Sequence, residues 1–170
     1  MLKHIAIIAF ASASLLAGCS QKAPEPGTIP PATQAERDEF GGNPGDKVNP
    51  RQDASVKELF CMNALGAACP ADIDERLAVY SVGQGFSRID LTDSFVRLKA
   101  SQDLGDPNAL ITDEAYVEAC YNVILGRHSD PGGFTDAVKF VKDTGERKTL
   151  VQSILRSPEF RTFGAEPTPG

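Results

Sequence analysis

The sequence has no tryptophan and only two histidines and four cysteines among its 170 residues. One histidine, His4, lies in the N-terminal leader, so a processed chain would keep only His128, and a two-histidine zinc site cannot be assembled. The sequence also lacks a C-x-x-C pair, a glycine-rich phosphate loop and a G-x-S-x-G nucleophile turn. HSDPGG and DLTDS contain oxygen ligands, but neither belongs to a twelve-residue calcium loop. We therefore predict no cofactor, no metal and no enzymatic activity.

Basic residues are fewer than acidic ones, 17 against 23, and the net charge is −6. Removal of a leader that contains Lys3 would bring the net charge to about −7. This excess of negative charge argues against a nucleic-acid partner and against adhesion to anionic lipid. A basic cluster near the C-terminus is interpreted as a solvated helix face and consists of Arg147, Lys148, Arg156 and Arg161.

The N-terminal apolar run, residues 5–16, is too short for a membrane-spanning helix, which needs about 20 apolar residues. A charged start precedes it and small residues follow it, which is the order found in a signal peptide. The tetrad that ends the run resembles the lipobox of bacterial lipoproteins and consists of Leu16, Ala17, Gly18 and Cys19. In that family the cysteine sulfur receives a diacylglyceryl group and the cysteine becomes the mature N-terminus.

The lipoprotein resemblance implies a cell-envelope protein held on a membrane by a lipid anchor such as palmitate on Cys19. Two or three acyl chains on one residue hold a protein firmly, whereas one chain binds only marginally. Ser20 after the cysteine, rather than aspartate, favours the outer membrane under the family's sorting rule. The alternative is an ordinary secreted protein in which Cys19 stands near the cleavage point by chance.

Residues 20–52 contain six of the twelve prolines and four glycines, with Phe40 as their only aromatic residue. Such a composition indicates an extended or coil-like chain without a core. We therefore predict a signal peptide over 1–18 and the lipidated cysteine with a disordered linker over 19–52. This linker would span between about 30 Å and about 100 Å. A flexible tail of similar composition is predicted over 165–170.

Residues 53–164, roughly 112 in number, are enough for one domain with its own core. With Cys19 lipidated, three cysteines remain in an oxidising compartment, so one of them stays unpaired. A disulfide between Cys61 and Cys69 would close a loop of about nine residues. The competing disulfide joins Cys61 to Cys120, which would otherwise pack as a small hydrophobic residue.

Apolar residues recur at helical spacing in six segments, which predicts an all-α bundle. The segments are marked by Val56, Leu59 and Phe60; Ile73, Leu77 and Tyr80; Leu91, Phe95 and Leu98; Val117, Cys120, Tyr121 and Ile124; Phe134, Val138 and Val141; and Leu150, Val151, Ile154 and Leu155.

Polar residues at the expected helix starts support these segments. Ser55 with Glu58 suggests a capping pattern, and the hydroxyl of Thr112 is expected to cap the fourth helix. Ser157 is expected to cap a last short turn that has Pro158 at its first position.

The first three segments match the last three in order. The shift is 61 residues for the first two pairs and 56 for the third, so the difference falls in the connection before the third segment. We interpret the domain as two diverged three-helix repeats, about 53–104 and 113–163, that share one core. The alternative is that two unrelated amphipathic bundles align by chance.

The second copy, YNVILGRHSDPGGFTDAVKFVKDTGERKTLVQSILRSPEF, resembles the bacterial domain of unknown function 4214 over about residues 115–163. It also resembles, more distantly, the phycobilisome linker domain. The family motif falls on Leu125, Gly126, Arg127, Asp130, Gly133, Gly145, Ser157, Glu159 and Phe160. The chain departs from the pattern where many members carry tryptophan, because Ala137 stands there.

Members of that family are accessory modules of secreted and surface proteins without shared catalytic residues, so the resemblance implies a structural role for the motif. We expect Gly126 to end a helix with left-handed backbone and Phe160 to fill the core. Arg127 is expected to pair with Glu159 or Asp130. Replacement of Arg127 by alanine should then lower the melting temperature, at a cost of about 3 to 5 kcal/mol if the pair is buried.

The function that these features favour is a non-enzymatic envelope lipoprotein whose helical domain binds or organises a surface protein or polysaccharide. One alternative is a glycan-processing or cell-wall-processing enzyme with two carboxylates about 5 to 10 Å apart, an arrangement that leaves no local sequence signature. Another is an inert structural spacer.

Overall fold

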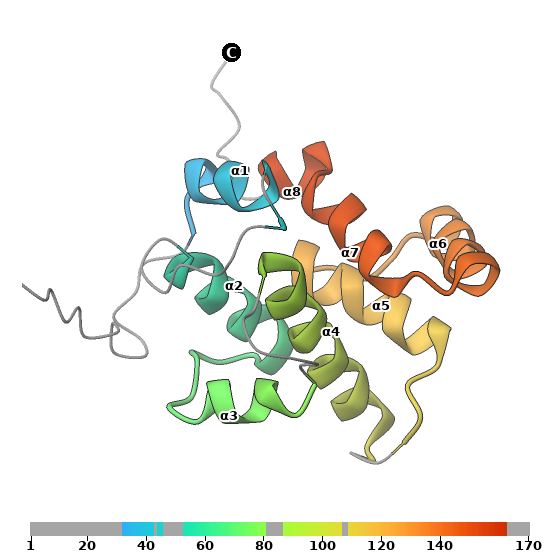
Figure 1. Ribbon diagram of the computed structural model, residues 1–170, viewed down its shortest axis with the longest axis horizontal. Coiled ribbons are helices and arrows are strands. Elements are labelled where there is room, and N and C mark those ends of the chain that lie inside the picture. The colour runs from blue at the N-terminus through green and yellow to red at the C-terminus, as the bar shows by residue number, and fades with distance from the viewer. Residues whose placement is uncertain (1–31, 43, 46–52, 81–86, 107–108, 163–170) are drawn as a thin grey trace, which may run out of the picture.

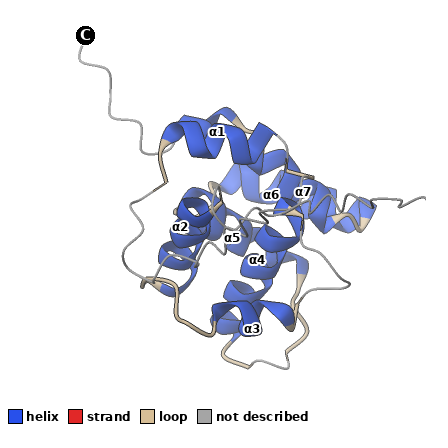
Figure 2. Cartoon of the chain, turned by 60° about the vertical axis from the view of Figure 1, so that its left-hand side comes forward, coloured by secondary structure: helices blue, strands red, loops and turns tan. Residues whose placement is uncertain are grey.

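The computed structural model of the chain describes residues 32–42, 44–45, 53–80, 87–106 and 109–162 (Figure 1). All elements in these ranges are helices, which confirms the all-α prediction (Figure 2). They are α1 (Gln34–Gly42), α2 (Ala54–Leu65), α3 (Ile73–Ala78), α4 (Arg88–Leu104), α5 (Asp113–Leu125), α6 (Pro131–Thr144), α7 (Arg147–Leu155) and α8 (Pro158–Thr162). The predicted signal peptide, lipobox, Cys19 and tail lie outside the described residues.

The core lies between α2, α4 and α5, which pack against one another at the centre of the bundle. Phe60, Phe95 and Tyr116 are fully buried there, and the rings of Phe60 and Phe95 meet edge to face with centroids 5.7 Å apart. Helices α6 and α7 pack against α5, while α3 packs against α4 (Figure 1). The apolar positions that mark the predicted segments therefore converge on one shared core.

Two of the three predicted N-terminal caps are confirmed. The Thr112 hydroxyl accepts a hydrogen bond from the Ala115 amide at 3.2 Å, and the Ser157 hydroxyl accepts one from the Phe160 amide, also at 3.2 Å. Each bond satisfies an amide that has no partner within its own helix.

The third predicted cap, Ser55 with Glu58, is wrong. Ser55 lies inside α2 and its hydroxyl donates to Glu36 of α1 at 2.9 Å. Glu58 turns inward, and one of its carboxylate oxygens accepts from the Cys69 amide at 3.1 Å. Both side chains bind neighbouring segments of the chain instead of the end of their own helix. Ser55 faces α1, and Glu58 faces the loop that follows α2.

That loop is closed by a disulfide between Cys61 and Cys69, the first of the two pairings considered. Their Cα atoms are 5.1 Å apart, within the range that a disulfide can span. Cys120 is a free, fully buried thiol on α5, and burial raises its pKa well above the ordinary value. It packs in the core as a small hydrophobic residue.

The predicted disordered linker over 19–52 is wrong for part of its length, because residues 34–42 form α1. This helix lies across the ends of α2, α7 and α8 (Figures 1 and 2). Phe40, the only aromatic residue of the segment, is fully buried, and its ring meets Phe60 edge to face at 5.8 Å. One large aromatic side chain thus joins the segment to the core despite its proline-rich and glycine-rich composition.

Polar contacts and one close approach fasten α1 as well. Arg88 at the start of α4 lies over the Phe40 ring at 5.2 Å and donates to the carbonyl of Glu39 at 3.0 Å. Gly41 packs so closely on the end of α7 that a Cβ atom there would overlap the Leu155 carbonyl oxygen. Only glycine fits this crossing.

The two proposed repeats agree in helix order but not in helix length. Helix α3 has six residues, whereas its counterpart α6 has 14. Helix α4 runs unbroken for 17 residues, whereas its counterpart is divided into α7 and α8 at Arg156 and Ser157. The glycines that end α2 and α5, Gly66 and Gly126, lie 60 residues apart, one fewer than the sequence alignment required. The duplication stays a prediction.

Candidate functional site

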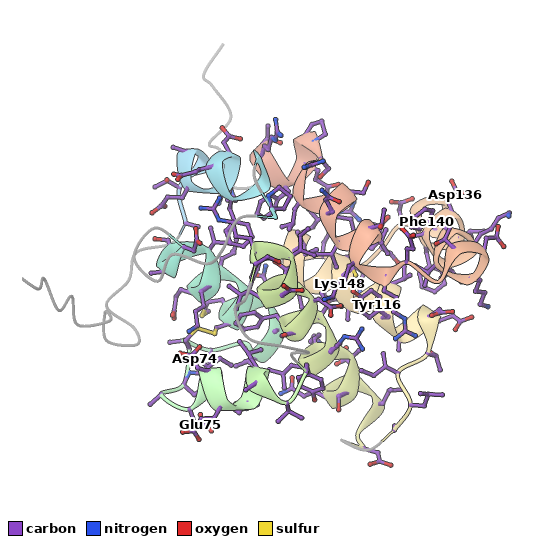
Figure 3. All side chains as sticks on the ribbon, viewed as in Figure 1. Asp74, Glu75, Tyr116, Asp136, Phe140 and Lys148 are labelled. Carbon is purple, nitrogen blue, oxygen red and sulfur yellow. A yellow bond between two sulfur atoms is a disulfide. The ribbon has the colours of Figure 1, made fainter. Side chains whose placement is uncertain are left out.

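A shallow hollow opens at the surface between α4 and the start of α7. It has a volume of about 330 Å³, and it is lined by Arg97, Gly145, Glu146, Arg147, Lys148 and Thr149. Arg97 comes from the middle of α4, and the other residues form the turn between α6 and α7 and the first residues of α7. Figure 3 labels Lys148 together with Tyr116, which lies below this surface.

Tyr116 supports the hollow from beneath. Its side chain is fully buried, and its hydroxyl donates to the carboxylate of Asp93 at 2.5 Å. The guanidinium carbons of Arg97 and Arg147 lie 5.7 Å and 4.9 Å from the centroid of its ring, so both make cation–π contacts. Burial raises the pKa of the Tyr116 phenol far above its ordinary value, so it is a neutral hydrogen-bond donor.

Three positively charged residues line the hollow: Arg97, Arg147 and Lys148. Each of them pairs with a carboxylate that does not line the hollow. Arg97 Nε donates to Asp93, four residues earlier on α4, at 2.9 Å. The other two pairs join different helices: Arg147 to Asp113 at 2.7 Å, and Lys148 to Asp90 at 2.5 Å. These pairs fix where the positive groups stand.

The ion pairs also set two pKa values. Burial alone would lower the pKa of Arg97, but the hydrogen bond and the charge of Asp93 outweigh it and raise the pKa. Burial alone would raise the pKa of Asp90, but hydrogen bonds from Lys148 and Ser87 outweigh it and lower the pKa. Both groups therefore stay charged at neutral pH.

The predicted solvated face of Arg147, Lys148, Arg156 and Arg161 is wrong for Arg147. Its side chain is only 22% exposed and donates to the Ile111 carbonyl at 2.8 Å as well as to Asp113. The other parts of this arrangement, Arg97, Asp93 and Tyr116, are not among the site residues predicted from the sequence. The Asp93–Arg97 spacing of four residues is a visible signal, since such residues share one face of a helix.

Part of the family motif forms a second cluster, where the loop between α5 and α6 meets α8. Arg127 donates through Nε and Nη2 to the two carboxylate oxygens of Glu159 at 2.5 and 2.8 Å, while its Nη1 lies 3.9 Å from Asp130. Its guanidinium also stands 5.2 Å from the Tyr121 ring centroid. Hydrogen bonds from Arg127 lower the pKa of Glu159.

The predicted pairing of Arg127 with Glu159 is confirmed, but the pair does not meet the condition of burial, because the two side chains are 37% and 44% exposed. Water solvates both charges, so the cost of about 3 to 5 kcal/mol that applies to a buried pair does not apply here. The pair joins the end of α5 to α8 but lies at the surface.

The other motif residues occupy structural positions. Gly126 ends α5 at φ 65° and Gly145 ends α6 at φ 72°, both in the left-handed region. A Cβ atom at Gly133 would stand 2.7 Å from the Tyr121 hydroxyl and 2.9 Å from the Asp130 carboxylate, so a larger residue would displace these side chains. The remaining members have these roles: Leu125 and Phe160 are buried in the core, Asp130 caps α6 through the Gly133 amide, and Ser157 caps α8.

A third polar group surrounds the histidine that the sequence leaves in a loop. Glu118 of α5 accepts from the Ser129 hydroxyl at 2.5 Å and lies 2.7 Å from His128 Nδ1. Burial alone would raise the pKa of Glu118, but hydrogen bonds from Ser129 and His128 outweigh it and lower the pKa. The His128 side chain is 88% exposed. Glu118 therefore fastens the loop between α5 and α6.

Within the described ranges, no three histidine, cysteine, aspartate or glutamate side chains gather as metal ligands would. In the same part of the chain, no helix combines the length and the apolar character that crossing a bilayer requires.

The architecture defines an all-α module, and its second half can be compared with a known family. Residues 99–163 match the family model described as "Domain of unknown function (DUF4214)". The match supports the domain assignment made from the motif, and it begins earlier, at Lys99 within α4. Helices α1 to α3 lie outside it. No curated protein and no solved structure matches the chain.

Proposed function

We propose that the chain is a bacterial envelope lipoprotein, anchored through acyl chains on Cys19, whose helical domain binds or organises another surface component without catalysis. The observation that carries this proposal is the order of residues at the N-terminus. A cation, a short apolar run, two small residues and a cysteine follow one another there as in a lipoprotein leader. The outer membrane is the proposed location.

The position of α1 supports a domain that a short linker holds near the membrane. Because α1 and the buried Ala32 before it belong to the domain, the stretch between Cys19 and the domain is shorter than the whole of 19–52. The 12 residues between Cys19 and Ala32 can reach at most about 45 Å when fully extended. A domain held at that distance would stay close to the membrane, where surface proteins and polysaccharides are concentrated.

The hollow between α4 and α7 supports a binding role for the domain. It presents charged groups that ion pairs hold in place, which lowers the entropy that a ligand must offset on binding. The distant likeness to the phycobilisome linker domain stays a prediction and fits an organising role.

The enzyme alternative receives less support from the described residues. A glycan-processing enzyme of the usual kind needs two carboxylates on opposite sides of its substrate. Glu146 is the only carboxylate among the residues that line the hollow, and its Oε2 accepts from the Thr149 hydroxyl at 2.7 Å.

Cross-linking in intact cells, followed by capture of the tagged full-length protein from solubilised envelopes, tests the proposal. We expect one surface protein or polysaccharide to be enriched over a control in which the same leader and linker carry an unrelated helical domain. Equal recovery from both proteins would contradict a binding role. If the control also rescued a deletion phenotype, the domain would be an inert spacer.

A further inference from the structure

The hollow between α4 and α7 offers more hydrogen-bond donors than the described residues of the chain satisfy. Arg97 uses only Nε, for Asp93, and its two terminal nitrogens make no hydrogen bond to any described residue. Arg147 donates through Nε and Nη2, and its Nη1 makes no hydrogen bond to any described residue. Both arginines line the hollow and come from different helices, α4 and α7.

Acceptors are scarce on the same surface. The carboxylates of Asp93 and Asp113 bind the Nε sides of the two arginines and do not line the hollow. Glu146 does line it, and one of its oxygens is occupied by the Thr149 hydroxyl. Asp93, Asp113 and Asp90 are not among the residues that line the hollow, so the described lining residues offer more hydrogen-bond donors than acceptors.

Arginine terminal nitrogens that are held in place favour one kind of ligand. A guanidinium edge matches the two oxygens of an oxyanion, and such charge-assisted bonds are roughly twice as strong as neutral ones. Contact with the Tyr116 ring and the acid pairs keeps both guanidiniums in position before any ligand arrives. The third cation, Lys148, is 51% exposed and can move toward a bound group.

We propose that this hollow binds the carboxylate groups of an acidic, uronate-type polysaccharide, with Arg97 and Arg147 as the principal contacts. The inference rests on the proposed function, since it names the class of surface component that the domain would hold. The hollow is open rather than enclosed, so one sugar unit can enter while the rest of a polymer continues along the surface. A free small carboxylate offers the same chemistry with fewer contacts.

The negative net charge of the chain means that an acidic polymer can bind only at a specific site. At −6, the protein as a whole repels polyanions, so general electrostatic attraction cannot produce binding. Any affinity for an acidic polymer must come from local geometry. Loss of one guanidinium at the hollow should then matter far more than loss of the same charge elsewhere.

Titration calorimetry on the full chain carrying Cys19→Ser tests this inference with three probes. They are an oligogalacturonate, a neutral maltodextrin of equal length and monomeric galacturonate. We expect the acidic oligomer to bind, the monomer to bind at least tenfold more weakly and the neutral oligomer not to bind. Amide resonances of residues 145–149 should shift during the titration.

Arg97→Gln is expected to weaken oligogalacturonate binding by at least tenfold, which corresponds to about 1.4 kcal/mol. Arg127→Gln is the matched control, because it removes a similarly exposed arginine that donates to a carboxylate on another surface, and it should leave binding unchanged. If Arg97→Gln lowers the melting temperature strongly, Arg97→Lys keeps a cation beside Asp93 and should still lose most of the affinity.

Three results would overturn the inference: no binding of the acidic oligomer, equal binding of the neutral one, or equal losses in the Arg97 and Arg127 variants. Monomer binding as tight as oligomer binding would assign the hollow to a free small carboxylate and overturn the polysaccharide assignment. If the oligomer fails but the cross-linking capture still enriches a partner, the proposed function stands without this ligand.

Discussion

The buried ion pair between Arg88 and Asp53 gives the sharpest prediction for stability. The two side chains are 5% and 3% exposed, and Arg88 Nε and Nη2 both donate to the Asp53 carboxylate, the latter at 2.7 Å. Arg88→Met removes the guanidinium and leaves a carboxylate in the interior. Breaking a buried pair in this way costs about 3 to 5 kcal/mol. Because Arg88 also binds the Glu39 carbonyl and covers Phe40, the variant should loosen α1.

Urea denaturation followed by circular dichroism measures this loss. With a slope of about 2 kcal/mol per molar, the midpoint should fall by about 2 M. The double variant Arg88→Met with Asp53→Asn should lose less than the single one, since it removes the charge of the buried carboxylate together with the guanidinium. A single-variant loss below about 1 kcal/mol, the size typical of an exposed pair, would refute the reasoning.

Three further predictions follow from other contacts. Gly41→Ala should cost about 1 to 3 kcal/mol, because its Cβ would overlap the Leu155 carbonyl, whereas Gly42→Ala, with open space around it, should stay within about 0.5 kcal/mol. Hydrogen exchange of α1 separates these outcomes, and equal protection in both variants would count against the close crossing. Arg127→Ala should cost no more than about 1 kcal/mol in a thermal melt, and a loss of several would mean that its pair with Glu159 is buried after all. The Glu118 pKa lies below its ordinary value of 4.5 in the folded chain, so its contribution is present above about pH 4.5 and is lost as pH falls through the folded pKa. Glu118→Gln should flatten the stability curve below pH 5, and an unchanged slope would disprove the role of this carboxylate.

The central helices could be predicted because their signals are local. Thr112 and the apolar spacing after it specify the start and the buried face of α5 within a few residues. Helix α1 could not be predicted in this way, because its apolar content is low and only Phe40 marks it. Its order comes from long-range contacts with Arg88 and Leu155, which have no local signature.

In the candidate site, too, the local contacts could be predicted from the sequence and the long-range contacts could not. The Asp93–Arg97 pair could be predicted from helical spacing, since its members are four residues apart on α4. The bonds of Asp93 to Tyr116 and of Arg147 to Asp113 join residues 23 and 34 positions apart. Because they depend on how α4, α5 and α7 pack, the hollow that they support emerges only from the fold.

Mass spectrometry of the N-terminal peptide from membrane-extracted protein tests the lipoprotein proposal most directly. We expect the mature chain to begin at Cys19 with a diacylglyceryl group on its sulfur, and a Cys19→Ser protein to keep its leader and lose this modification. An unmodified thiol at Cys19, on a protein released by gentle lysis without detergent, would contradict the account.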